Sequence, residues 1–210
     1  LYGLLICWLL FWRLRRLRYL LLMGLVALGL CGHLVYAALI QHAQCKVVCY
    51  SLDQHQAVAF IQGSRSTLWT DDRLDMTTRE YAHHIAPSHV AWGVTQVAHH
   101  RFTEASQRTG FPLRSWRGLK VAVFRGRCFV FVHKGSLPLH LPSTKLRADF
   151  LVVEDNAVTS LQPWLDRFDV GMLVIGASNT RQRTQRLKQA AAQQGICSHA
   201  LLQEGALVVE

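Results

Sequence analysis

The sequence predicts an α/β fold behind an apolar helical segment, and three observations support this. Short apolar strands alternate with helical patterns in the last third of the chain, two hairpin patterns precede them, and a long apolar run lies near the start. Alternation of this kind is typical of βαβ units and a partly parallel sheet. Hairpins followed by βαβ units indicate a sandwich with helices on the outside.

Length and composition limit the organisation of the chain. Its 210 residues suffice for one ordinary domain and an appendage, and 50% apolar with 17% charged residues exclude a disordered chain. Four of the 23 basic residues and none of the 13 acidic residues fall in residues 1–40. Because the chain begins with leucine inside an apolar run, we expect it to be a piece of a longer protein.

The N-terminal region has the pattern of two membrane helices. Residues 19–40 are long enough, at about 1.5 Å each, to cross a hydrocarbon core of roughly 30 Å. Residues 1–12 are equally apolar and are interpreted as the end of a truncated helix. A secretory signal peptide is the alternative interpretation, but its apolar core is usually shorter, and here an apolar block precedes the basic residues.

The basic loop RLRRLR at residues 13–18 sets the expected orientation. Arginine is retained on the cytoplasmic side of membranes, so the helix at 19–40 is predicted to run outward. Residues 41–210 are then predicted to lie outside the cytoplasm, where disulfides are chemically permitted. A bridge between Cys45 and Cys49 is not expected, because four residues of strand span roughly 13 Å.

The first half of the exported part shows strand patterns. Residues 46–52 and 57–61 predict one hairpin, residues 66–69 a third strand, and residues 119–124 and 128–133 a second hairpin around Gly126.

Two helices are predicted between these hairpins. One covers residues 77–85 and ends at Pro87, and the other covers residues 97–106.

The C-terminal third predicts a βαβ succession. Strands are expected at residues 149–153 and 170–176, separated by a helix at about 161–168. Ser178 or Asn179 is then expected to cap a basic helix that ends at Gly195. Residues 196–201 and 206–209 are expected to complete the sheet.

No catalytic metal site or nucleophile is visible in the pattern. Zinc sites need closely spaced ligands, yet the eleven histidines form no H-x-H or H-E-x-x-H, and no C-x-x-C is present. The neighbouring pairs His83/His84 and His99/His100 would diverge in regular structure. The cluster Asp71, Asp72 and Asp75 is interpreted as a solvated loop, although three carboxylates could hold a cation. No G-x-S-x-G and no phosphate-binding glycine loop occurs.

Basic residues around the second hairpin are the candidate nucleic-acid contacts. They are interleaved with Trp116, Phe124 and Phe129, a composition compatible with backbone contact and base stacking on single-stranded nucleic acid. The alternative is a charged rim on strands whose aromatic residues face the core. The candidates are Arg114, Arg117, Lys120, Arg125 and Arg127.

Two segments resemble the C-terminal part of ComEC-type competence proteins, inner-membrane channels through which transforming single-stranded DNA enters bacteria. They are VVCYSLDQHQAVAFIQGSRSTLWTDD (47–72) and ADFLVVEDNAVTSLQPWLDRFDVGMLVIGASNTRQRTQRLKQAAAQQGICSHALLQEGALVVE (148–210). The resemblance implies that residues 41–210 form a metallo-β-lactamase-like αββα sandwich. It also implies that the protein lies in the bacterial inner (plasma) membrane. It also implies family-like structural positions at Asn156, Ser178, Asn179 and Gly205.

The metal ligands of that family are replaced in this sequence. Metal-binding members carry a His-His-Gly-Ser run after the strand at 149–153, where this chain has Glu154, Asp155, Asn156 and Ala157. The resemblance therefore implies a degenerate domain without metal or cofactor, similar to Bacteroidetes-type members.

Three functions follow as hypotheses. The first is a non-catalytic, periplasm-facing domain of a DNA uptake channel, with the membrane, single-stranded DNA and the rest of the channel as partners. The second is a membrane-tethered, metal-dependent hydrolase or nuclease using His83, His84, His89 and Asp155. The third is a protein-interaction domain of a membrane assembly that never contacts DNA.

Overall fold

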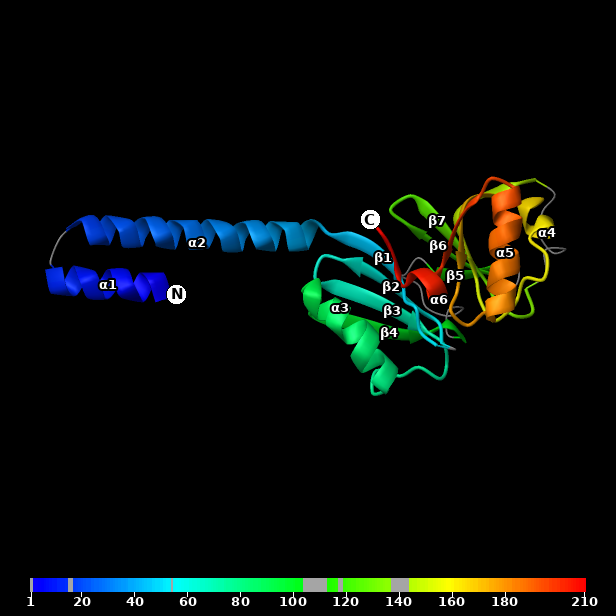
Figure 1. Ribbon diagram of the computed structural model, residues 1–210, viewed down its shortest axis with the longest axis horizontal. Helices are drawn as coiled ribbons and strands as arrows, with labels where there is room; N and C mark the ends of the chain where they lie inside the picture. The colour runs from blue at the N-terminus through cyan, green and yellow to red at the C-terminus, as the bar shows by residue number, and fades with distance from the viewer. Residues whose placement is uncertain (1, 15–16, 54, 104–112, 117–118, 137–143) are drawn as a thin grey trace. The chain divides into compact units, whose positions relative to one another are not determined.

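The computed structural model describes residues 2–14, 17–53, 55–103, 113–116, 119–136 and 144–210 (Figure 1). The chain divides into two compact units, Leu1–Gln44 and Cys45–Glu210. The division falls between the apolar region and the region of mixed composition, and each unit is described by itself.

The first unit consists of two helices that pack on each other, α1 (Tyr2–Leu14) and α2 (Leu17–Ala43). Both are longer than predicted, because Arg13 belongs to α1 and Arg18 to α2. Within the described part of the chain, one helical stretch is long and apolar enough to cross a membrane. This stretch, Arg18–Ala43, has a mean hydropathy of 2.1 and is not buried against protein.

The second unit is α/β, as predicted, and its first sheet contains β1–β4 and β11. The strand order is β11-β1-β2-β3-β4, with β3 and β4 parallel and the other neighbours antiparallel. The first predicted hairpin and the third strand are confirmed. The strands are β1 (Cys45–Cys49), β2 (Ala57–Gln62), β3 (Arg65–Thr70), β4 (Gln96–Arg101) and β11 (Leu207–Val209).

The second sheet has the order β10-β9-β8-β7-β6-β5, and it is mixed. Neighbours from β7 to β10 are parallel, while β5, β6 and β7 are antiparallel. The second predicted hairpin is therefore confirmed. The strands are β5 (Leu113–Trp116), β6 (Leu119–Phe124), β7 (Arg127–Val132), β8 (Leu146–Val153), β9 (Phe168–Ile175) and β10 (Cys197–Ala200).

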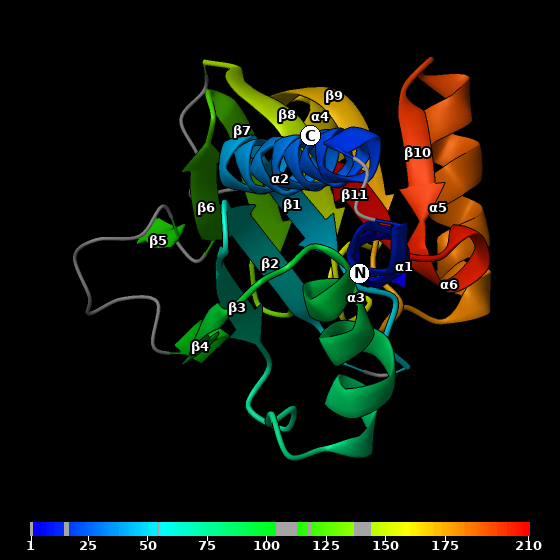
Figure 2. The ribbon, with the colours of Figure 1, turned by 90° about the vertical axis from the view of Figure 1, so that its left-hand side faces the viewer.

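Three apolar clusters separate four layers in the order helix, sheet, sheet, helix. Phe60 and Trp69 of the first sheet meet Phe129 and Val152 of the second in the central cluster. The outer face of the first sheet packs against η1 (Tyr81–Ile85) and α3 (Ala86–Ala91). The outer face of the second sheet packs against α4 (Gln162–Leu165) and α5 (Arg181–Gln193), and Figure 2 shows α5 beside β10.

The prediction that Pro87 ends a helix was wrong. The chain remains helical from Tyr81 to Ala91, with a π-helical turn before α3 in which the N–H of Ala86 bonds to the carbonyl of Tyr81. Pro87 occupies the first turn of α3, and the π-helical turn before it accommodates a residue without an N–H and does not end the helix.

The predicted helix at 97–106 was also wrong over its described part. Residues 96–101 form β4, parallel to β3, and residues 104–112 lie outside the described residues. Val97 packs into the outer cluster, while His100 lies against the ring of Trp69. Tertiary pairing with β3 overrides a local pattern that fits either structure.

The C-terminal succession is confirmed in type and corrected in detail. Thr180, rather than Ser178 or Asn179, is the N-cap of α5, because its side chain accepts a hydrogen bond from the N–H of Arg183. The helix expected at 161–168 is the shorter α4, since Phe168 already belongs to β9. Residues 207–209 join β1 in the first sheet instead of extending the second.

The register defines two opposite ends of the sandwich. At one end of the sandwich, Cys45 pairs with Gln62, and Gln62 pairs with Arg65. We call this the anchor end, because in the chain only Gln44 separates α2 from Cys45. We call the other end, formed by the segments after β3, β8 and β9, the mouth. Strands of eight residues place the two ends roughly 26 Å apart.

Candidate functional site at the mouth

The mouth is organised by hydrogen bonds between the loops that follow β8 and β9. The N–H of Asp155 donates to Ser178 Oγ at 2.8 Å, and Ser178 Oγ donates to Glu154 Oε2 at 2.5 Å. The N–H of Asn156 donates to Asn179 Oδ1 at 2.9 Å. Asp155 and Asn156 both have φ near +50°, a region that short polar side chains tolerate better than most.

Asn179 joins the two loops from a buried position. Its Nδ2 donates to the carbonyls of Val153, at 2.7 Å, and Gly176, at 2.9 Å. Asn156 makes the reciprocal contact from the other loop, because its Oδ1 accepts a hydrogen bond from the N–H of Thr180. The family-like positions Asn156, Ser178 and Asn179 thus form one hydrogen-bond network. We call these three residues and Glu154 the latch.

Gly205, the fourth family-like position, lies outside the latch. It ends α6 (Leu201–Glu204) with φ of +85°, where a side chain would be strained, and its carbonyl lies 3.0 Å from His199 Nε2.

Glu154 is a buried carboxylic acid that lies over Gly176. A Cβ at position 176 would come within 1.7 to 2.1 Å of the Glu154 carboxyl group, so only glycine leaves room for it. Burial raises the pKa of Glu154 to about 8, and the nearby carboxylates of Asp155 and Asp71 act in the same direction, while the Ser178 hydrogen bond opposes them. Glu154 is therefore largely protonated at neutral pH.

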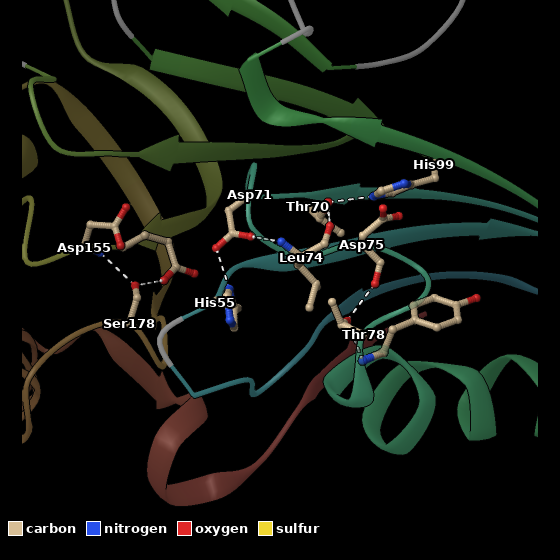
Figure 3. Close-up of polar contacts among 11 residues, drawn as sticks. His55, Thr70, Asp71, Leu74, Asp75, Thr78, His99, Asp155 and Ser178 are labelled. Atoms are coloured by element: carbon tan, nitrogen blue, oxygen red, sulfur yellow. Dashed lines mark hydrogen bonds and ion pairs between the residues drawn. The ribbon is translucent and has the colours of Figure 1, made fainter.

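The first sheet contributes an aspartate–histidine pair to the mouth. Asp71, directly after β3, accepts from the N–H of Leu74 and lies 2.9 Å from His55 Nδ1 (Figure 3). The Asp155–Ser178 pair in the same close-up comes from the other sheet. Asp75 lies on the following turn and bonds to Thr78, so it does not join Asp71 at the mouth.

Lys120 brings a cation to this carboxylate-rich region. It lies on the same face of β6 as Ala122, which points into the central cluster, and its Nζ lies 4.6 Å from the centre of the Phe102 ring. Burial lowers the pKa of Lys120 to about 8, although Asp72 and Asp155 oppose the shift. Burial and the nearby Lys120 lower the pKa of His133 to about 4.

The candidate nucleic-acid residues do not form one strip over their described members. Arg114 pairs with Val121, which packs toward the helix side of the sheet, whereas Lys120 faces the interior. Arg125 and Arg127 flank the exposed turn at the anchor end, where the Arg125 guanidinium lies 2.8 Å from Cys45 Sγ. Arg117 lies outside the described residues.

The residues of the alternative metal site lie in different layers. His89 of α3 is bonded through Nε2 to Ser66 near the anchor end, and His83 contacts Arg79. Asp155 is held in the latch at the mouth. In the described part of the chain no three His, Cys, Asp or Glu side chains come together as a metal site would require.

Sequence reasoning missed the roles of Glu154, Lys120 and the His55–Asp71 pair. Glu154 carried a signal, because a polar residue directly after a buried parallel strand lies at the edge where ligands bind in α/β sheets. No signal in the sequence indicated that Lys120 points inward, since β6 has apolar residues on both of its faces.

The fold and site define a class: a four-layer α/β domain that follows an apolar helix in the chain, and whose mouth loops are joined by side-chain hydrogen bonds. The model of the ComEC C-terminal domain family matches residues 47–210, and the chain belongs to this family. Membership supports a role in competence DNA uptake and association with a membrane. No curated protein and no solved structure matches the chain.

Proposed function

We propose that residues 45–210 form a non-catalytic, extracytoplasmic domain of an inner-membrane channel that takes up single-stranded DNA. The observation that carries the proposal is the family match over residues 47–210 directly after an apolar helix of membrane-spanning length. The resemblance to metallo-β-lactamase-like domains supplies the comparison for the mouth.

The latch supports the absence of catalysis. At the positions where related metal-binding loops supply histidines, this chain uses its side chains and N–H groups to join the loops after β8 and β9. Glu154 is buried over Gly176, and Asn179 is hydrogen-bonded to the segments that follow both β8 and β9. A metal ion in the mouth would have to break these contacts to recruit oxygen ligands.

The charge of the first unit supports the outward orientation. Arg13 and Arg18 lie at the facing ends of α1 and α2, the connection that we place in the cytoplasm. The far end of α2 then emerges on the periplasmic side, where the second unit begins.

An impermeant thiol reagent tests this orientation. Cys197 is exposed, so in right-side-out membrane vesicles it should be labelled in the full chain, and labelling should fall to that of the half-buried Cys45 and Cys128 in the matched control Cys197→Ser. Trypsin added outside should digest residues 45–210 in the same vesicles. Labelling and digestion only in inverted vesicles would place the domain in the cytoplasm and refute the orientation.

Metal analysis tests the absence of catalysis. The purified full chain should contain no stoichiometric zinc or manganese after incubation with either ion and desalting. Stoichiometric metal together with hydrolytic activity that is lost in Asp155→Ala would support the membrane-tethered hydrolase instead. A further control is His84→Ala, which should change neither measurement, because His84 lies on the outer helical layer.

A further inference from the structure

The anchor end carries an arginine-rich rim. Arg65 begins β3, and Arg125 and Arg127 flank Gly126 at the tip of the β6–β7 hairpin. All three side chains are exposed. The contact between Arg125 and Cys45 places the hairpin tip next to the first residue of β1.

Covalent continuity keeps this rim near the end of α2. Only Gln44 separates Ala43 from Cys45, so their Cα atoms are at most about 7.6 Å apart whatever angle the units adopt. A bilayer that holds α2 therefore has its headgroup region within reach of the long Arg125 side chain.

Two carboxylates toward the anchor end are paired with cations, while Asp169 at the start of β9 is exposed. Glu210 pairs with Lys46, and Asp149 pairs with Arg147 at 2.8 Å. Among the described residues, none of the ion pairs involves Arg65, Arg125 or Arg127. The mouth at the opposite end carries charges of both signs, because the cations Arg73, Arg101 and Lys120 lie there with the carboxylates Asp71, Asp72 and Asp155.

Exposed apolar side chains accompany the arginines. Val123, two residues before the hairpin turn, is 57% exposed, and Val90 near the end of α3 is 78% exposed. Lys46 lies over the ring of Trp92, which directly follows α3. Arginine, aliphatic and tryptophan side chains together are the composition of a surface that lies in a lipid headgroup layer.

We infer that the anchor end docks on the surface of an anionic bilayer, with Arg65, Arg125 and Arg127 on lipid phosphates and Val123 at the level of the acyl-chain boundary. This inference rests on the proposed function only in that α2 lies in a membrane, and it holds for either side. Docking would turn the mouth away from the bilayer toward the aqueous phase.

Lipid fits this rim better than single-stranded nucleic acid. Base stacking needs exposed aromatic faces. At the hairpin, Phe60 packs against both Phe124 and Phe129 between the sheets, and the exposed apolar residue is Val123.

Hydrogen exchange of the full chain in nanodiscs tests the docking. The N–H groups of residues 123–128 should exchange more slowly in discs with phosphatidylglycerol than in pure phosphatidylcholine, and the difference should shrink at high salt. In Arg125→Gln/Arg127→Gln the docked-to-free ratio should fall about five-fold for each cation removed, equivalent to about 1 kcal/mol each. Arg65→Gln provides an independent variant outside the hairpin.

The matched control is Arg181→Gln/Arg186→Gln, which removes the same charge from exposed positions of α5 and should leave the exchange of residues 123–128 unchanged. Equal exchange of this segment in both lipids would overturn the inference. Protection by an oligonucleotide in phosphatidylcholine discs, without protection by anionic lipid, would overturn it in favour of nucleic acid. None of these outcomes depends on whether the domain is catalytic or extracytoplasmic.

Discussion

Gly176 and Glu154 show how a single missing side chain shapes the mouth. The glycine is needed here for space, because the Glu154 carboxyl group occupies the volume that a Cβ would fill. The carboxyl group is held there by Ser178 and so lies away from solvent. Glu154 is therefore part of the protein interior.

A double-mutant cycle tests this packing. Gly176→Ala should lower the free energy of unfolding by about 1–3 kcal/mol, because the new methyl group displaces the Glu154 carboxyl group. In a Glu154→Ala background the same change should cost well under 1 kcal/mol. Urea unfolding of the full chain in detergent micelles measures both. Equal costs in the two backgrounds would show that Glu154 does not lie over Gly176.

The raised pKa of Glu154 predicts a pH dependence of stability. Between pH 4.5 and about 8 the folded state keeps a proton that the unfolded state releases, so stability falls as the pH rises through this window. The slope from this group is at most about 1.4 kcal/mol per pH unit.

The range from pH 6.5 to 7.5 isolates this contribution. The lowered pKa of His133 makes stability rise with pH, but only below pH 6.5. The lowered pKa of Lys120 also makes stability rise with pH, but only above about pH 8. Glu154→Gln should flatten the decline in unfolding free energy between pH 6.5 and 7.5. An unchanged slope would mean that Glu154 is ionised in the folded protein.

At the scale of elements, Gly126 in the β6–β7 turn is needed for its backbone conformation and not for space. Arg125 and Gly126 both have positive φ, as the common two-residue hairpin turn requires, and a Cβ on Gly126 would meet nothing within 4 Å. The turn therefore separates conformational strain from packing, in contrast to Gly176.

Two substitutions at this turn should affect the stability of the domain differently. Gly126→Ala should destabilise the domain by about 1 kcal/mol, the cost of placing a Cβ in the left-handed region. Arg125→Asn should be neutral or stabilising, since asparagine tolerates that region better. Thermal unfolding followed by circular dichroism measures both. Destabilisation of similar size in both variants would contradict the turn geometry.

The elements also show where local patterns are sufficient. The hairpins at β1–β2 and β6–β7 were predictable, because strand alternation and turn residues agree. The strand at residues 96–101 was not predictable, since a six-residue segment with histidines fits helix or strand until β3 provides a parallel partner. Pro87 was misread because the π-helical turn before α3 admits it without ending the helix.

At the scale of the whole molecule, the distribution of the basic residues bears on DNA binding. The described candidates Arg114, Lys120, Arg125 and Arg127 lie on different faces or at different ends. Contact with single-stranded DNA, which belongs to the proposed role in uptake, would therefore be distributed and modest.

Salt dependence measures this contact. The affinity of the full chain in nanodiscs of phosphatidylcholine for a single-stranded oligonucleotide should fall with salt, with a slope of roughly 0.7 per phosphate contact. Arg125→Gln/Arg127→Gln should lower that slope by at most about two such increments. No binding at low salt would favour the protein-interaction domain over a DNA-contacting one.

By itself, the sequence determined the apolar helix, the α/β class and the polar run Glu154, Asp155 and Asn156 after a buried strand, because hydropathy, alternation and residue identity are local properties. The tertiary structure alone decided which loops meet. It buried Glu154 over Gly176, turned Lys120 inward beside Phe102, placed β11 in the first sheet and brought the hairpin tip to Cys45. These features depend on contacts between residues far apart in the chain, which local patterns do not encode.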